Sequence, residues 1–129
     1  MKILVVEDNA SKRMQIEEFL TRRGVGFETI GYVEPALKYI AENQNDISGI
    51  ILDLSLKTDE NSNDYHPKKG LVISEELNKR KIDIPIMLNS ETLMPTLFLS
   101  RNIYSQRRGM NDYRTLEEFL VFLKEKQEQ

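Results

Sequence analysis

Acidic side chains follow two apolar runs of this chain, at the point where each run ends. Glu7 and Asp8 come directly after residues 3–6, and Asp53 comes directly after residues 50–52. Short apolar runs of this kind are typical of buried parallel strands, whose carboxyl ends share one edge of a sheet and form its ligand crevice. Three carboxylates at that edge supply the oxygen ligands that Mg²⁺ prefers, and a backbone carbonyl and water complete such a shell. The two acidic tracts together predict a hard-cation site.

The elements that must position these carboxylates alternate along the chain. Strands are predicted over residues 2–6, 27–32, 48–54, 84–88 and 103–104. Helical spacing of apolar residues predicts helices through Met14, Ile16, Phe19 and Leu20; through Ala36, Leu37, Tyr39 and Ile40; through Leu71, Val72, Ile73 and Leu77; and through Leu116, Phe119, Leu120 and Leu123. Residues 91–101 fit either a short helix or an irregular segment. The alternation predicts one doubly wound α/β domain over residues 1–129, with a five-stranded parallel sheet and helices on both faces.

Local signals mark several helix ends. Residues 9–11 provide capping side chains for the first helix, and Gly24 is suited to the turn that ends it. Pro35 fits the first turn of the second helix. Thr115, with Glu118 three residues later, forms a capping box. These signals predict where the helices begin and end.

Length, charge and composition restrict the class of protein. The 129 residues are enough for one domain with its own core, and 40% of them are hydrophobic. A net charge of −3, from 18 basic and 21 acidic side chains, argues against binding nucleic acid through overall charge. The chain has no cysteine, and no apolar stretch approaches the roughly 20 residues of a membrane span. A cytoplasmic protein without a signal peptide is expected.

Over essentially all of its length, the sequence resembles the receiver domain of two-component response regulators, and this resemblance implies a flavodoxin-like fold. Asp53 falls where the family has its phosphoacceptor, and Ser90, five residues after Pro85, falls where it has a small hydroxyl residue. The remaining matches are the opening strand with its acidic pair at residues 7–8, Gly70 before the third helix, and residues 115–118 at the start of the last helix.

The resemblance implies a role for each residue of the site. Glu7 and Asp8 hold Mg²⁺ directly or through water. Asp53 is both a metal ligand and the nucleophile, and the backbone carbonyl of Ser55 completes the protein ligands. Ser90 donates its hydroxyl to a phosphoryl oxygen. Phosphoryl transfer needs an in-line nucleophile and neutralised equatorial oxygens, which such a site supplies.

The family's lysine at the end of the fifth strand is missing here. That strand also carries an aromatic residue that turns inward on phosphorylation, and Tyr104 is the candidate for it. Counting back from Thr115 places the lysine position at Gly109, whereas counting forward from Tyr104 places it at Arg107. We prefer Arg107 because it keeps a cation where phosphoryl charge develops, although a guanidinium is bulkier and more delocalised than an ammonium.

Three further features lie around the expected site. The connection from Asp53 to Gly70 is much longer than is usual in the family, so residues 57–69 either cover the pocket or offer a docking surface. Glu91 places a carboxylate where the family has a small residue at the end of the fourth strand. The single histidine, His66, lies in the polar loop and is expected to be solvent-exposed and not to be a ligand.

The leading hypothesis is a stand-alone phosphoreceiver and not an enzyme. A histidine kinase or phosphotransfer protein would phosphorylate Asp53, and the phosphorylated form would control contacts with a downstream target. Direct contacts with nucleic acid or membrane are not expected, and a homodimer through the last helix stays open. The alternative is a pseudo-receiver that binds partners without phosphorylation. A small Mg²⁺-dependent phosphatase ranks last, because Ser55 stands where a second acid is needed.

Overall fold

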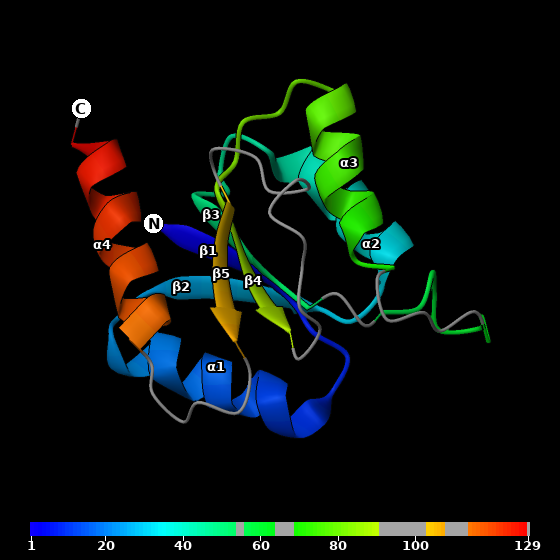
Figure 1. Cartoon of the computed structure of the whole chain (residues 1–129), viewed down its shortest axis with the longest axis horizontal. Coiled ribbons are helices and arrows are strands. Elements are labelled where there is room, and N and C mark those ends of the chain that lie inside the picture. The colour runs from blue at the N-terminus through cyan, green and yellow to red at the C-terminus, as the bar shows by residue number, and fades with distance from the viewer. Residues whose placement is uncertain (54–55, 64–68, 91–102, 108–113, 129) are drawn as a thin grey trace.

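A parallel sheet lies at the centre of the folded molecule, with helices around it (Figure 1). The computed structural model describes residues 1–53, 56–63, 69–90, 103–107 and 114–128, and for residues 90, 103–107, 114 and 115 it describes the backbone. The strands in these ranges are β1 (Lys2–Val6), β2 (Gly26–Ile30), β3 (Gly49–Leu52), β4 (Ile86–Ser90) and β5 (Ile103–Arg107). Their order is β2-β1-β3-β4-β5, and each neighbouring pair is parallel. The predicted flavodoxin-like sheet is confirmed.

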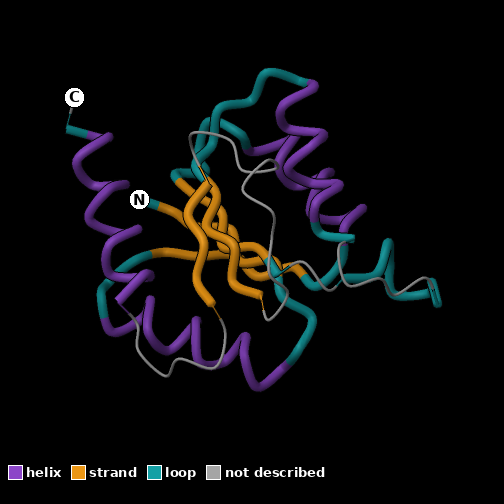
Figure 2. The backbone as a smooth tube through the Cα atoms, in the orientation of Figure 1, coloured by secondary structure: helices purple, strands orange, loops and turns teal. Residues whose placement is uncertain are grey.

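The inner strands β1 and β3 are buried on both faces of the sheet, and successive side chains of each strand point to opposite faces. In β1, Ile3 and Val5 belong to one hydrophobic cluster, whereas Leu4 and Val6 belong to the other. The first cluster includes residues of α1 (Ala10–Arg22) and α4 (Arg114–Gln127), and the second includes residues of α2 (Val33–Asn43) and α3 (Leu71–Lys79). Figure 2 shows these two helix pairs on opposite sides of the strands. The prediction of helices on both faces is confirmed.

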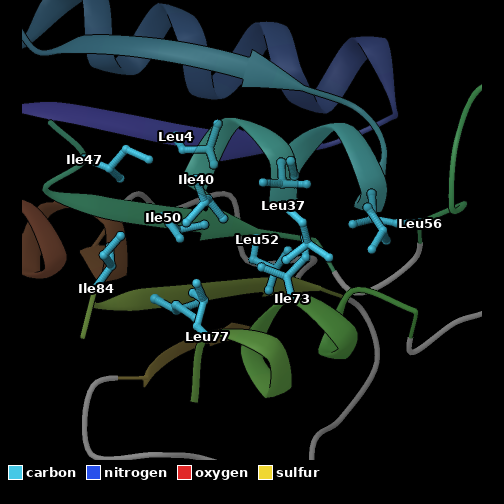
Figure 3. Packing of buried hydrophobic residues seen from close by; sticks show 14 of the residues in the cluster. Leu4, Leu37, Ile40, Ile47, Ile50, Leu52, Leu56, Ile73, Leu77 and Ile84 are labelled. Carbon is cyan, nitrogen blue, oxygen red and sulfur yellow. The ribbon is translucent and has the colours of Figure 1, made fainter. Parts of the chain in front are cut away.

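The buried members of the cluster under α2 and α3 are all aliphatic. Ile40 of α2 and Ile73 of α3 lie over Ile50 and Leu52 of β3 (Figure 3). On the opposite face, the predicted apolar stripe of α4 is buried in full: Leu116, Phe119, Leu120 and Leu123.

The helix ends follow their local signals with one exception. The Asn9 side chain accepts a hydrogen bond from the Lys12 N–H at 3.0 Å and caps α1. Gly24 follows α1 at φ +69°, a left-handed conformation that glycine adopts without strain. The prediction for Thr115 is wrong, because α4 begins at Arg114 and Thr115 already lies inside its first turn. None of the helices in the described ranges is long and apolar enough to cross a membrane.

Strand boundaries shift slightly from the predicted ones. β2 ends before Tyr32, which pairs with Lys57 and precedes α2. β4 begins after Pro85, which lacks an N–H for the ladder, although its carbonyl accepts the Ile50 N–H at 2.9 Å. β4 and β5 also continue further into polar residues than predicted. The shifts have a common cause, since pairing with a neighbouring strand decides where a strand stops.

Two of the apolar residues from which the helices were predicted are exposed. Met14 is 64% exposed. It lies two residues before Ile16, which is about 200° around a helix with 3.6 residues per turn, so the two side chains point to opposite sides of α1. Val72 of α3, beside the buried Ile73, is 37% exposed. In α1 and in α3, the apolar residues at helical spacing therefore include one that does not face the core.

Candidate metal centre

Main-chain hydrogen bonds extend the sheet ladders as far as the acidic tracts. The Asp53 N–H donates to the carbonyl of Val6 at 2.9 Å, and the Glu7 N–H donates to the carbonyl of Ile30 at 3.1 Å. β1 and β3 pair with Val6 opposite Leu52, so that Glu7 and Asp53 come next on the two strands. Both acids are thus held at the carboxyl edge of adjacent strands.

The three acidic residues come together as the sequence predicts. Carboxylate oxygens of Glu7, Asp8 and Asp53 all lie within 4.8 Å of one another. Glu7 is 1% exposed and Asp53 is 2% exposed, whereas Asp8 is exposed. The acidic cluster, meaning these three residues, is therefore closed on the sheet side and open to solvent at Asp8.

Two features of the protein around the acidic cluster offset charge repulsion within it. Like charges at this separation repel one another, and burial strengthens the repulsion. The Asn9 N–H donates to the Glu7 Oε1 atom at 3.2 Å, and α1 begins at the next residue with the positive end of its dipole toward the cluster. A divalent cation among the oxygens would neutralise the remaining charge.

The donor set fits Mg²⁺. Mg–O distances of about 2.1 Å place ligands on opposite sides of the ion about 4.2 Å apart. The spread of the acidic cluster is close to that value, so a small closure of the side chains is enough. Exposed Asp8 leaves one side open for the water molecules that Mg²⁺ retains.

The backbone brings two further predicted residues to the same edge. β4 ends at Ser90, β5 ends at Arg107, and these two residues are paired in register. Tyr104 lies earlier on β5, which is an edge strand, and pairs with Met87 of β4. The remaining predicted positions lie outside the described residues: Ser55, His66, Glu91 and Gly109.

One contact beside the acidic cluster was not predicted from the sequence. A polar loop is predicted from residue 57 onward, but the first residues of that loop are packed and hydrogen-bonded in the structure. Leu56 is fully buried, and the carbonyls of Lys57 and Thr58 accept hydrogen bonds from the first N–H groups of α2. The described part of the loop, residues 56–63, leaves the sheet beside α2 (Figure 1). The available signal was Leu56, an apolar residue at the edge of the polar stretch.

Neither a scan against protein-family models nor a search of curated proteins finds a match for this sequence. Solved structures do match its fold. The response regulator TrrA from Thermotoga maritima, determined in complex with Mg²⁺-BeF, is 23% identical over 95% of this chain and 97% of TrrA, with a TM-score of 0.72. TrrA is also known in complex with the histidine kinase ThkA.

Two other similar structures are receiver domains as well. A CheY-like response regulator receiver domain protein from Methanospirillum hungatei is 15% identical over 98% of this chain and 96% of that protein, with a TM-score of 0.73. The receiver domain of the Francisella response regulator 1452 is 17% identical over 97% of this chain and 98% of that domain, with a TM-score of 0.74. This chain therefore has the receiver-domain fold.

Proposed function

We propose that this chain is a phosphoreceiver of a two-component or phosphorelay system, in which Asp53 accepts a phosphoryl group in the presence of Mg²⁺. The observation that carries the proposal is the acidic cluster of Glu7, Asp8 and Asp53 at the carboxyl edge of a sheet with the receiver strand order. TrrA, which has the same fold, was determined in complex with Mg²⁺-BeF, and this supports both the metal and the phosphoryl chemistry.

The proposed reaction transfers the phosphoryl group from a phosphohistidine. A carboxylate oxygen of Asp53 attacks the phosphorus and forms an O–P bond, while the P–N bond breaks and its electron pair stays on the imidazole nitrogen. That nitrogen takes a proton from solvent. When bound, Mg²⁺ offsets the charge of the phosphoryl oxygens and of the acidic cluster.

The side chains of this edge have separate tasks in the proposal. Glu7 and Asp8 hold the cation with Asp53, and the Ser55 carbonyl is the proposed fourth ligand. The Ser90 hydroxyl donates to one phosphoryl oxygen, and the Arg107 guanidinium offsets charge on another. The pairing of Ser90 with Arg107 at adjacent strand ends supports their joint assignment.

The proposed partners are proteins. The TrrA–ThkA complex supports a histidine kinase as donor, and a phosphotransfer protein has the same phosphohistidine chemistry. A downstream target would recognise the phosphorylated form, in the cytoplasm. The chain itself would turn over no substrate, and we expect no phosphatase activity on a phosphoester in excess.

Amide chemical shifts during a Mg²⁺ titration test this function, with and without beryllofluoride, a mimic of the acyl phosphate. We expect the amides of Asp53, Ser90 and Tyr104 to shift with Mg²⁺ and to shift further with beryllofluoride. The matched control is Asp53→Asn, which keeps the shape of the side chain and removes its charge and nucleophile. Beryllofluoride shifts that persist in Asp53→Asn would show that Asp53 is not the acceptor.

A phosphorylation-independent pseudo-receiver is the second candidate, and one observation favours it. β5 ends in Arg107, and its five residues include no lysine to contact a phosphoryl group. The two candidates differ in how a partner binds. A partner captured equally well with and without phosphodonor, and equally well by Asp53→Ala, would favour the pseudo-receiver.

A further inference from the structure

The link between β2 and α2 lies against the acidic tract of β1. The Ile30 carbonyl accepts the Glu7 N–H at 3.1 Å. At the next residue, Gly31, the position that a Cβ atom would take is 3.6 Å from the Cα of Asp8. This link therefore runs beside the backbone that carries two of the three carboxylates, close enough that a side chain at Gly31 would be in van der Waals contact with it.

The same link is hydrogen-bonded to the chain that follows the third carboxylate. We call residues 56–58 the strap. Its Lys57 carbonyl accepts the Val33 N–H at 3.0 Å, and its Thr58 carbonyl accepts the Glu34 N–H at 2.8 Å. Tyr32, the N-cap residue of α2, makes no side-chain capping bond, so the strap supplies carbonyl partners to the first turn of the helix.

A short connection joins the strap to Asp53. Only two residues separate Asp53 from Leu56, which limits the distance between their Cα atoms to roughly 11 Å. Leu56 is fully buried in the cluster under α2 and α3. The strap is thus tied to the acidic cluster at one end and to α2 through its carbonyls.

We propose that the first turn of α2 is coupled to cation binding: a divalent cation at Glu7, Asp8 and Asp53 draws the two acidic tracts together and tightens the strap on the Val33 and Glu34 amides. The inference rests on the metal site of the proposed function and adds the element that responds to it. A coupling between two sites acts equally in both directions, so loosening the strap from α2 weakens cation binding.

Amide hydrogen exchange measures the first direction of this coupling in the unmodified protein. We expect the Val33 and Glu34 amides to exchange at least about fivefold more slowly in saturating Mg²⁺ than in EDTA. A factor of about five is the lower end of typical coupling factors. Amides at the far end of α2, near Asn43, serve as the internal control and are expected to change little. Bound Mg²⁺ with unchanged exchange at both first-turn amides would overturn the inference.

A matched pair of variants at Val33 measures the reverse direction. Val33→Pro removes the N–H that the Lys57 carbonyl accepts, and the backbone tolerates proline there because Tyr32 is extended at φ −138° and ψ 155°. Val33→Ala keeps the N–H but loses more of the buried side chain than proline does. Packing loss alone would therefore harm the alanine variant more.

The Mg²⁺ dissociation constants of the two variants decide between coupling and packing. We expect Val33→Pro to bind Mg²⁺ about fivefold or more weakly than Val33→Ala does. Equal affinities in the two variants would overturn the inference and leave the proposed function standing. A wild-type protein that binds no Mg²⁺ at the acidic cluster would overturn both.

Discussion

Asp53 and Glu7 show how single residues are placed against their own preference. Carboxylate side chains are usually exposed, yet Glu7 and Asp53 are almost completely buried at the end of apolar strands. Their N–H groups are fixed by the ladders to β1 and β2, so neither acid can leave the edge without breaking a sheet hydrogen bond. Such a placement concentrates negative charge where a cation can bind, which is typical of functional sites.

The packing of α4 against the sheet leaves no room for a side chain at Gly49. A Cβ atom at Gly49 would lie 2.7 Å from Leu123 Cδ1 and 3.0 Å from Phe119 Cζ, and both of these side chains are buried. We predict that Gly49→Ala lowers the free energy of unfolding by about 1–3 kcal/mol, measured by urea denaturation. Gly26→Ala is the control, because only the Met1 carbonyl is near, at 3.5 Å. Equal stabilities for the two variants would contradict this packing.

At the scale of elements, the start of α1 serves both the helix and the acidic cluster. The Asn9 side chain caps the helix through the Lys12 N–H, and the Asn9 backbone N–H donates to Glu7. The two tasks use different atoms of one residue. A substitution of the side chain can therefore separate helix stability from the position of Glu7.

We predict that Asn9→Ala lowers the free energy of unfolding by about 1 kcal/mol, the usual cost of a lost N-cap. Urea denaturation in EDTA measures the loss. Asn9→Ser keeps a capping oxygen and is expected to lie close to the wild type. If the alanine and serine variants were equally stable, the Asn9 cap would contribute nothing to the fold.

The strap joins elements that are distant in the sequence. The strap follows β3 in the chain and pairs with the residues at the start of α2, which follows β2. In the sheet, β1 lies between β2 and β3. A response at the acidic cluster therefore reaches α2 through main-chain hydrogen bonds that do not depend on the identity of exposed side chains.

At the scale of the whole molecule, the sheet links metal binding to folding. The acidic cluster takes residues from β1 and from the end of β3, so it exists only when the sheet is formed. A ligand that binds the folded state alone stabilises it in proportion to the logarithm of its concentration.

We predict that Mg²⁺ at 100 times its dissociation constant raises the free energy of unfolding by about 2.7 kcal/mol relative to EDTA. Urea denaturation at a series of Mg²⁺ concentrations measures this gain. Asp53→Asn should lose most of it, because one ligand is weakened. In EDTA the same variant should be at least as stable as the wild type, since repulsion within the acidic cluster decreases. A wild-type gain that Asp53→Asn retains in full would place the cation elsewhere.

Much of the candidate site could be predicted because its signal is local. An apolar run followed by an acid gives both the strand and the position of the acid at its carboxyl end, which is why Glu7, Asp8 and Asp53 were placed correctly. The position of Ser90 at the end of β4 was predicted in another way, from the resemblance to receiver domains. The roles of Ser90 and Arg107 stay predictions, since the described structure places only their backbone.

The sequence alone determined the alternation of strands and helices, the two apolar faces of each central strand, and the edge at which the acids gather, because each depends on residues within a few positions of one another. Only the tertiary structure decided that β1 lies between β2 and β3, that the strap binds the first turn of α2, and that Gly49 faces α4. These features join segments far apart in the chain. No local pattern shows which N–H group a backbone carbonyl will accept, or which side chains will pack against a glycine.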